Sequence, residues 1–83
     1  MQFEWDRAKA ASNRRKHGIA FEEATSVFAD PDHSLLERRE IIVGKAQNRL
    51  LVISFTERQD NIRIISARRA SARERKRYEE NNP

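Results

Sequence analysis

The segment RIISARRASARERKR, from Arg63 to Arg77, sets seven basic side chains against one acid, Glu74. Its first half is typical of a buried strand and its second half of a helix. The planar guanidinium of arginine matches the oxygens of a phosphate group and keeps its charge at physiological pH. The segment therefore predicts a partner that carries phosphate. The alternative is a solvated helix surface whose basic residues pair with neighbouring glutamates.

If residues 61–69 form a strand, alternation divides their side chains between two faces of a sheet. The predicted faces are Ile62, Ile64 and Ser66 toward a core, and Arg63, Ile65, Ala67 and Arg69 toward an open binding surface. A charged side chain within a strand needs a partner, because burying it unpaired is costly. We expect that partner to be either a carboxylate of this chain or a phosphate of the substrate.

His17 and Glu57 are the residues whose side chains could transfer a proton. His17 lies in the segment NRRKHG at the end of a predicted helix, where the helix dipole also favours the cation of Lys16. A histidine there is either a structural residue or a proton-transfer group. Glu57 is either a base or a turn residue paired with its neighbours. The sequence leaves these alternatives open.

The segment DPDH, from Asp30 to His33, comes nearest to a metal-binding cluster. Asp-Pro is ordinary turn chemistry and other obvious ligands are missing, so a turn is the favoured interpretation. The chain has no cysteine, which excludes disulfides and thiolate zinc sites. We therefore predict neither a metal nor another cofactor.

Two helices are expected before most of the strands. Asp6 is a good N-cap for the first helix, and Gly18 would end it in a left-handed conformation. Residues 21–28 carry an apolar stripe at helical spacing and form the second helix. The small-residue face of the first helix, predicted to lie close against a sheet, consists of Ala8, Ala11 and Ser12.

The remaining segments predict strands and a final helix. Strands are expected at residues 2–5, 39–45, 48–57 and 61–69, and Ser71 with Glu74 forms a capping box for the last helix. Short turns join the last three strands and make them antiparallel. The predicted fold is therefore α+β, an antiparallel sheet with packed helices in the order β-α-α-β-β-β-α.

Length and charge limit the kind of protein. The 83 residues are enough for one domain with a modest core. A net charge of +4 and a pI of about 10.1 favour an anionic partner. No segment approaches the ~20 apolar residues of a membrane span, and the first residues lack the apolar stretch of a signal peptide. We expect a cytoplasmic protein that does not enter a membrane.

Two long segments resemble the BrnT family of toxins from bacterial type II toxin–antitoxin systems. They are FEWDRAKAASNRRKHGIAFEEA near the start of the chain and TERQDNIRIISARRASARERKRYE near its end. The resemblance implies a RelE-like fold with two N-terminal helices and a C-terminal helix. It also implies a ribonuclease that cuts RNA, halts translation and blocks growth.

The same resemblance implies a partner. Members of the family are neutralised by BrnA, a ribbon-helix-helix antitoxin that binds DNA, in a heterotetramer of two toxins and two antitoxins. Operator DNA would then be reached only through the antitoxin. A small nucleic-acid-binding module, or an inactive homologue that only binds an antitoxin, is the alternative to a ribonuclease.

Metal-free RNA cleavage uses the 2′-hydroxyl of the substrate as nucleophile, so the protein must move protons and stabilise charge on phosphorus. We assign charge stabilisation to Arg63 and Arg69, and acid or base catalysis to His17 or Glu57. The residues predicted to hold the RNA backbone are Lys16, Arg68, Arg73 and Arg77, with Arg68 also in reserve for charge stabilisation.

Overall fold

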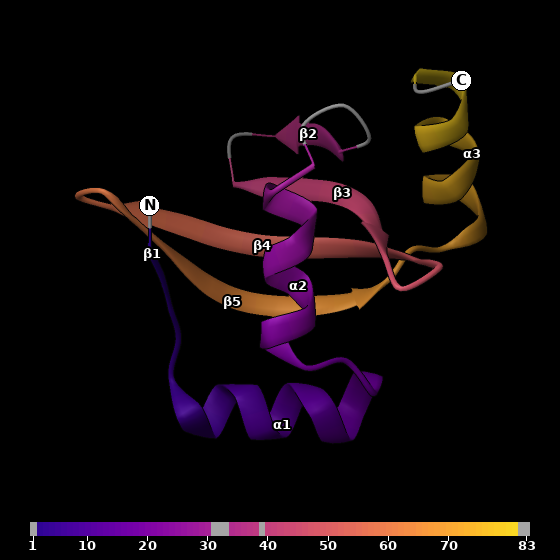
Figure 1. Cartoon of the computed structure of the whole chain (residues 1–83). Coiled ribbons are helices and arrows are strands. Elements are labelled where there is room, and N and C mark those ends of the chain that lie inside the picture. Colours follow the sequence, from indigo (N-terminus) through magenta and orange to yellow (C-terminus); the bar gives the residue numbers. More distant parts are fainter. Residues whose placement is uncertain (1, 31–33, 39, 82–83) are drawn as a thin grey trace.

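The computed structural model describes residues 2–30, 34–38 and 40–81 of the chain. Its elements are β1 (Gln2–Glu4), α1 (Arg7–His17), α2 (Phe21–Phe28), β2 (Ser34–Arg38), β3 (Ile41–Ala46), β4 (Arg49–Arg58), β5 (Asn61–Arg69) and α3 (Ala72–Asn81). The strands form one sheet in the order β1-β5-β4-β3-β2. In Figure 1, α2 crosses one face of this sheet, α1 runs along β5, and α3 follows the end of β5. The predicted α+β class and the three predicted helices are confirmed.

The sheet differs from the prediction in two ways. β2 is an additional strand, and β1 pairs in parallel with β5, so the sheet is mixed rather than antiparallel. The long connection between β1 and β5 permits a parallel pair, which a short turn cannot make. The β2 sequence SLLER places its two apolar residues side by side. It lacks the alternation by which an edge strand is recognised.

α1 begins and ends as the sequence predicts. Asp6 Oδ1 accepts hydrogen bonds from the backbone N–H groups of Ala8 and Lys9 at 2.7 and 3.4 Å. Gly18 ends the helix with φ of 70°, a left-handed conformation that glycine adopts without steric cost. Local capping chemistry alone therefore defines both limits of this helix.

The prediction of which residues of α1 face the sheet is wrong. Ala8 and Ala11 are exposed, whereas Ala10 packs against the core and Asn13 is buried. Several alanines are spaced along this helix, so small size does not decide which side faces the sheet. The buried amide decides it, because its hydrogen bonds reach the backbone of β5.

The main core lies between α2 and the sheet. Phe28 of α2 stands between Phe3 of β1 and Phe55 of β4, with ring centroids 5.4 and 5.0 Å apart. Aromatic contacts of this kind add about 0.5–1.5 kcal/mol each beyond the apolar area they bury. They hold β1 at the edge of the sheet. The fully buried side chains of α2 are Phe21, Ala24 and Val27.

The opposite face of the sheet is covered at one end. There Tyr78 of α3 packs with Val43, Leu50 and Val52. Among the described residues, no helix covers the remainder, which we name the open face. Its side chains on β4 and β5 are those of Ser54, Thr56, Arg58, Asn61, Arg63, Ser66 and Arg68.

A β-bulge interrupts β5 at Ile65. Ser54 of β4 pairs with Ser66, but the next residue, Phe55, pairs with Ile64, so Ile65 has no partner of its own. One extra residue reverses the alternation of every side chain that follows it. The bulge therefore divides β5 into two halves whose side chains alternate out of phase.

This reversal corrects the predicted faces of β5. Ala67 is buried in the main core, and Arg69 lies opposite Leu51 on the face that α2 covers. Arg63 lies on the open face and shares it with Arg68. The prediction that Arg63, Ala67 and Arg69 share one face is wrong, because strict alternation was assumed across the bulge.

Gly44 lets α2 pack directly on β3. A Cβ atom at this position would lie 2.5 Å from Ser34 Oγ and 2.7 Å from Val27 Cγ1, closer than side chains tolerate. Ser34 Oγ donates a hydrogen bond of 2.6 Å to the carbonyl of Val27, so its position is itself fixed. The contact between helix and strand at this point depends on the missing side chain.

The substitution Gly44→Ala should lower the free energy of unfolding by about 1–3 kcal/mol, because the added methyl group overpacks this contact. Urea denaturation of the parent and the variant measures the difference. In a Val27→Ala background the same substitution should cost less, since one of the two close contacts is removed. An equal cost in both backgrounds would contradict the packing explanation.

Candidate nucleic-acid interface

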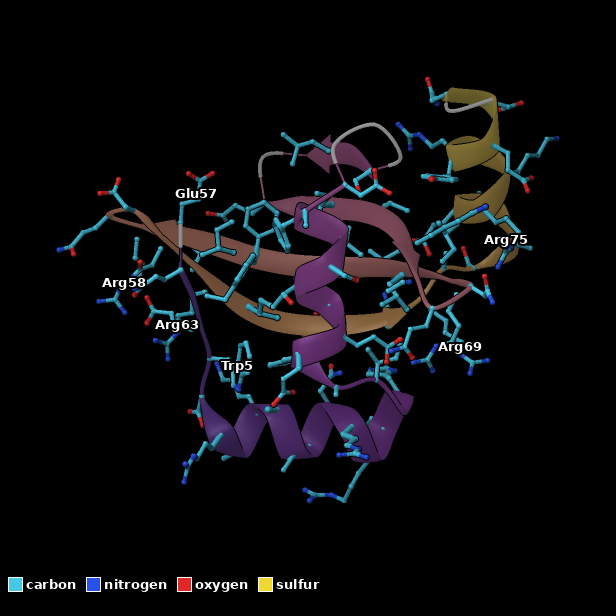
Figure 2. All side chains as sticks on the ribbon, in the orientation of Figure 1. Trp5, Glu57, Arg58, Arg63, Arg69 and Arg75 are labelled. Carbon is cyan, nitrogen blue, oxygen red and sulfur yellow. The ribbon has the colours of Figure 1, made fainter. Side chains whose placement is uncertain are left out.

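Arg63 and Arg69, the two residues predicted to stabilise charge, lie at opposite ends of β5 (Figure 2). Six residues of strand separate their Cα atoms, which corresponds to roughly 20 Å. Their side chains also lie on opposite faces of the sheet, as a result of the bulge. A single phosphate cannot contact both guanidinium groups, so the predicted catalytic residues form two separate groups.

The first group surrounds Arg63. Its guanidinium donates to Glu4 Oε2 at 3.2 Å, and both side chains are about one-third exposed. Arg63 pairs across the strands with Thr56, so the adjacent Glu57 lies on the other face. Glu57 is exposed near the β4–β5 turn. The structure thus does not bring Glu57 and Arg63 to one face, and a carboxylate of this chain already balances Arg63.

The second group lies where β5 ends beside the last turn of α1. Arg69 is exposed there, as are Lys16 and His17 at the end of α1. The two elements are joined just before this point by hydrogen bonds between Asn13 and Ala67. Figure 1 shows both elements ending on the same side of the molecule. We name Lys16, His17 and Arg69 the basic corner.

Arg49, at the start of β4, stabilises the chain next to the basic corner. It forms an ion pair with Glu23 of α2, and both side chains are largely buried. Its second guanidinium nitrogen donates to the carbonyl of Gly18 at 3.4 Å. These bonds connect β4 to the segment between α1 and α2. Arg49 is therefore a structural residue whose charge is balanced.

Arg68 is held by Glu74 on the open face. Two guanidinium nitrogens of Arg68 donate to the two carboxylate oxygens of Glu74, each at 2.8 Å. Glu74 also accepts from the backbone N–H of Ser71 at 2.8 Å, and Ser71 Oγ accepts from the N–H of Glu74 at 3.2 Å. The predicted capping box is thus present. The ion pair connects it to β5 and orients α3.

These contacts change the ionisation of both groups. The hydrogen bonds from Arg68 lower the pKa of Glu74 to about 2, and the backbone hydrogen bond from Ser71 acts in the same direction. The hydrogen bond to Glu74 raises the pKa of Arg68. Arg68 was predicted to bind RNA. In the structure, the two guanidinium nitrogens that would bind a phosphate are hydrogen-bonded to the carboxylate of Glu74, in the same geometry.

α3 adds further cations around its exposed side. Tyr78 is buried and Glu74 half-buried, so the helix faces the sheet with this pair. The exposed basic residues of α3 are Arg73, Arg75, Lys76 and Arg77. Arg73 lies in the first turn, four residues after Arg69 in the chain. Arg73 is thus closer to Arg69 in the chain than the basic residues of the later turns of α3 are.

The cations of the described chain therefore divide into paired and unpaired groups. Arg49, Arg63 and Arg68 each have a glutamate partner. Within the ranges the structure describes, no ion pair is found for Lys16 or Arg69. Free positive charge is thus available at the basic corner. On the open face Arg63 and Arg68 are balanced by glutamates, whereas Arg58, near the β4–β5 turn, has no ion pair within the described residues.

Metal ligands do not gather in the described part of the chain, where no group of three histidine, cysteine or acidic side chains could hold an ion. Of the segment DPDH, only Asp30 belongs to the described residues, so its predicted turn lies outside them. None of the described helices is long and apolar enough to cross a membrane.

Sequence reasoning missed two residues that organise this surface. Glu4 was not paired with Arg63, because 59 residues separate them in the chain. Asn13 was noted only as part of a motif, although an amide in the interior of a helix is a weak sign of a specific bond. The ion pair between Arg68 and Glu74 could have been found from the sequence, since the predicted capping box already placed Glu74 close to the end of β5.

The fold and the basic corner together define a class of small basic α+β proteins suited to an anionic polymer. Residues 5–74 match the family described as "Ribonuclease toxin, BrnT, of type II toxin-antitoxin system", and the chain belongs to this family. The resemblance found in the sequence is thereby confirmed. As a member of a type II system, the protein is a ribonuclease toxin that has an antitoxin partner.

A solved structure supports the fold. The chain is similar to the crystal structure of the Brucella abortus ribonuclease toxin BrnT, with a TM-score of 0.69 and 22% sequence identity. The match covers 86% of this chain and 97% of that one. A comparison with curated protein sequences gave no match.

The substitution Glu74→Gln should lower the free energy of unfolding at pH 7 by about 0.5–1 kcal/mol, a small value because solvent screens the half-exposed pair. The pKa of Glu74 is depressed, so the pair stabilises the parent fully above about pH 4.5 and stops doing so as the pH falls through about 2. The stability difference between parent and variant should therefore disappear in acid.

Thermal denaturation from pH 7 to pH 2 measures this difference. Glu79→Gln, the same change at an exposed position of α3, serves as the control and should leave the pH dependence unaltered. A Glu74→Gln variant that remains less stable than the parent by the same amount at pH 2 would show that the charge of Glu74 is not responsible.

Proposed function

We propose that this toxin is a metal-independent endoribonuclease that cuts RNA at the basic corner and thereby inhibits translation and growth. The observation that carries the proposal is the location of unpaired charge. Lys16 and Arg69 have no carboxylate partner within the described residues, and the exposed His17 follows Lys16 at the end of α1. A phosphate can approach these groups without displacing an internal ion pair.

Three side chains of the corner are proposed to act in metal-free cleavage. The 2′-oxygen of one ribose attacks the adjacent phosphorus, a 2′,3′-cyclic phosphate forms, and the bond to the 5′-oxygen breaks. His17 is the proposed proton-transfer residue, which takes the 2′-hydroxyl proton or supplies one to the departing 5′-oxygen. Arg69 is proposed to stabilise the added negative charge on the phosphate oxygens. Lys16 and Arg73 would hold the neighbouring phosphates.

The remaining predicted site residues receive smaller roles in this proposal. Arg63 and Glu57 lie about 20 Å from the corner along β5, so they would contact RNA several nucleotides away or not at all. Arg68 would act indirectly, by orienting α3 through Glu74. Arg77 would contribute to the attraction of the RNA backbone as one of the exposed cations of α3.

The proposed partner is a BrnA-type ribbon-helix-helix antitoxin in a heterotetramer of two toxins and two antitoxins. An acidic segment of such a partner would be attracted to the same unpaired cations that attract RNA. Neutralisation would then follow from competition for the basic corner. The RNA substrate and the translation machinery lie in the cytoplasm, where the toxin is proposed to act.

The test is to incubate the purified toxin, free of antitoxin, with total RNA in EDTA and to resolve the products on a gel. We expect fragments, and we expect Arg69→Ala and His17→Ala to slow their formation by about 100-fold or more. Arg63→Ala should slow it by less than about tenfold, since Arg63 is already paired and distant from the corner.

Arg7→Ala removes one exposed cation from the other end of α1 and serves as the matched control for charge. It should cut RNA at the parental rate. RNA that is bound but never shortened would instead support a nucleic-acid-binding module or an inactive toxin. A larger defect in Arg63→Ala than in Arg69→Ala would move the active site to the opposite end of β5.

The loss of activity should also appear in cells. Expression of the Arg69→Ala toxin should permit growth that expression of the parent arrests, while the variant still purifies as a complex with its antitoxin. The physical reason is that one exposed side chain is removed without changing the core. Growth arrest by the variant at the parental level would contradict the assignment of Arg69.

A further inference from the structure

Asn13 is the one buried polar residue of the described chain, with 6% of its surface exposed. Its amide nitrogen donates to the carbonyl of Ala67 at 2.8 Å and to the carbonyl of Ile19 at 3.1 Å. Its amide oxygen accepts from the N–H of Ala67 at 3.1 Å. The side chain thus makes a two-way hydrogen-bonded pair with the backbone N–H and C=O of one residue of β5, as a neighbouring strand would.

This pair supplies hydrogen bonds to backbone groups at an edge of β5 that no neighbouring strand covers among the described residues. β1 pairs with β5 along residues 61–63, so within the described ranges no strand lies on the outer side of the later part of β5. Ala67 lies in that later part, and its N–H and C=O need partners because the residue is fully buried. Asn13 supplies both partners from α1.

The pair also fixes the position of α1 along β5. The apolar residues of α1 are Ala8, Ala10 and Ala11, so the helix has no large apolar side chain to lock it in place. Alanine contacts permit a helix to slide with little loss of packing. Two hydrogen bonds to the backbone of a single residue do not permit sliding, because a shift of even 1 Å would break their geometry.

α1 and β5 run in the same direction (Figure 1), so distances from the pair can be compared. Four residues of helix, from Asn13 to His17, advance about 6 Å. Two residues of strand, from Ala67 to Arg69, advance about 6.6 Å. His17 is therefore level with Arg69, and within the described part of the chain the pair at Asn13 is the direct bond between α1 and β5 nearest to these two residues.

We propose that Asn13 is a positioning residue for RNA cleavage, which holds Lys16 and His17 of α1 in register with Arg69 of β5. This inference rests on the proposed function of the basic corner. Catalytic groups must be held within a fraction of an ångström, and a misplacement of about 1 Å can reduce the rate 100-fold. Asn13 touches no reacting atom and acts through the elements that it joins.

The position of α1 along β5 can be measured without an assay of RNA cleavage. The chain has no cysteine, so Lys16→Cys and Arg69→Cys can be introduced together and labelled with nitroxides. Dipolar broadening of the spectrum should be strong with Asn13 and weaker with Asn13→Asp, which places a carboxylate oxygen against two carbonyls. Asn13→Ser retains a hydroxyl that donates to one carbonyl, and serves as the milder variant.

Asn81→Asp is the control, because it makes the same chemical change at an exposed residue of α3. Its spectrum should match that of the parent. Equal broadening in a folded Asn13→Ser or Asn13→Asp protein would overturn the proposal. Failure of both variants to melt cooperatively would also overturn it, since Asn13 would then serve folding alone.

Kinetics on a single-stranded RNA oligonucleotide test the connection to His17. Asn13→Ser should lower kcat about 10- to 100-fold with KM within about twofold, because the charges that bind RNA remain. In a His17→Ala background the same substitution should lower kcat less than twofold, since the group it positions is absent.

A full additional loss in the His17→Ala background would mean that Asn13 acts by another route, and would overturn the proposal. A parent protein that cuts no RNA would contradict the proposed function instead. The nitroxide spectra would still decide in that case whether Asn13 sets the register of α1 against β5.

Discussion

The hydrogen bonds between the side-chain amide of Asn13 and the backbone N–H and C=O of Ala67 are the constraint on which the arrangement of this protein depends. A buried polar group that lacks partners costs about 1–3 kcal/mol, so an open strand edge must be covered by something that can donate and accept. α1 covers it with one side chain in place of a whole strand. The third bond of the amide, to Ile19, extends the same constraint into the segment that leads to α2.

The distribution of charge follows from this framework. β5 carries arginines on both faces, yet those on the open face are matched by Glu4 and Glu74, which come from β1 and α3. Of the three arginines at positions 63, 68 and 69 of β5, only Arg69, where α1 and β5 end together, has no ion pair within the described residues. A net charge of +4 is modest, but its effect on a polyanion depends on where unpaired charge is gathered. Attraction of RNA to such a corner would fall as salt increases, because each phosphate contact releases counterions.

The parts of the fold that local chemistry defines could be predicted from the sequence. Asp6 and Gly18 delimit α1, the apolar stripe of residues 21–28 forms α2, and Ser71 with Glu74 begins α3. β2 could not be predicted, because its residues lack alternation and its pairing depends on β3. The bulge at Ile65 was equally hidden, since it exists only in relation to the register of β4.

The sequence by itself determined the class of fold, the helix limits, the basic character and the membership in a toxin family, because each depends on residues that are close in the chain or on long continuous motifs. Tertiary structure alone decided which charges are free. Glu4 and Arg63 are 59 residues apart, and Asn13 and Ala67 are 54 apart. The bulge at Ile65 then places Arg69 on the opposite face of the sheet from Arg63. Contacts of this kind depend on strand register, and a shift of one residue reverses them.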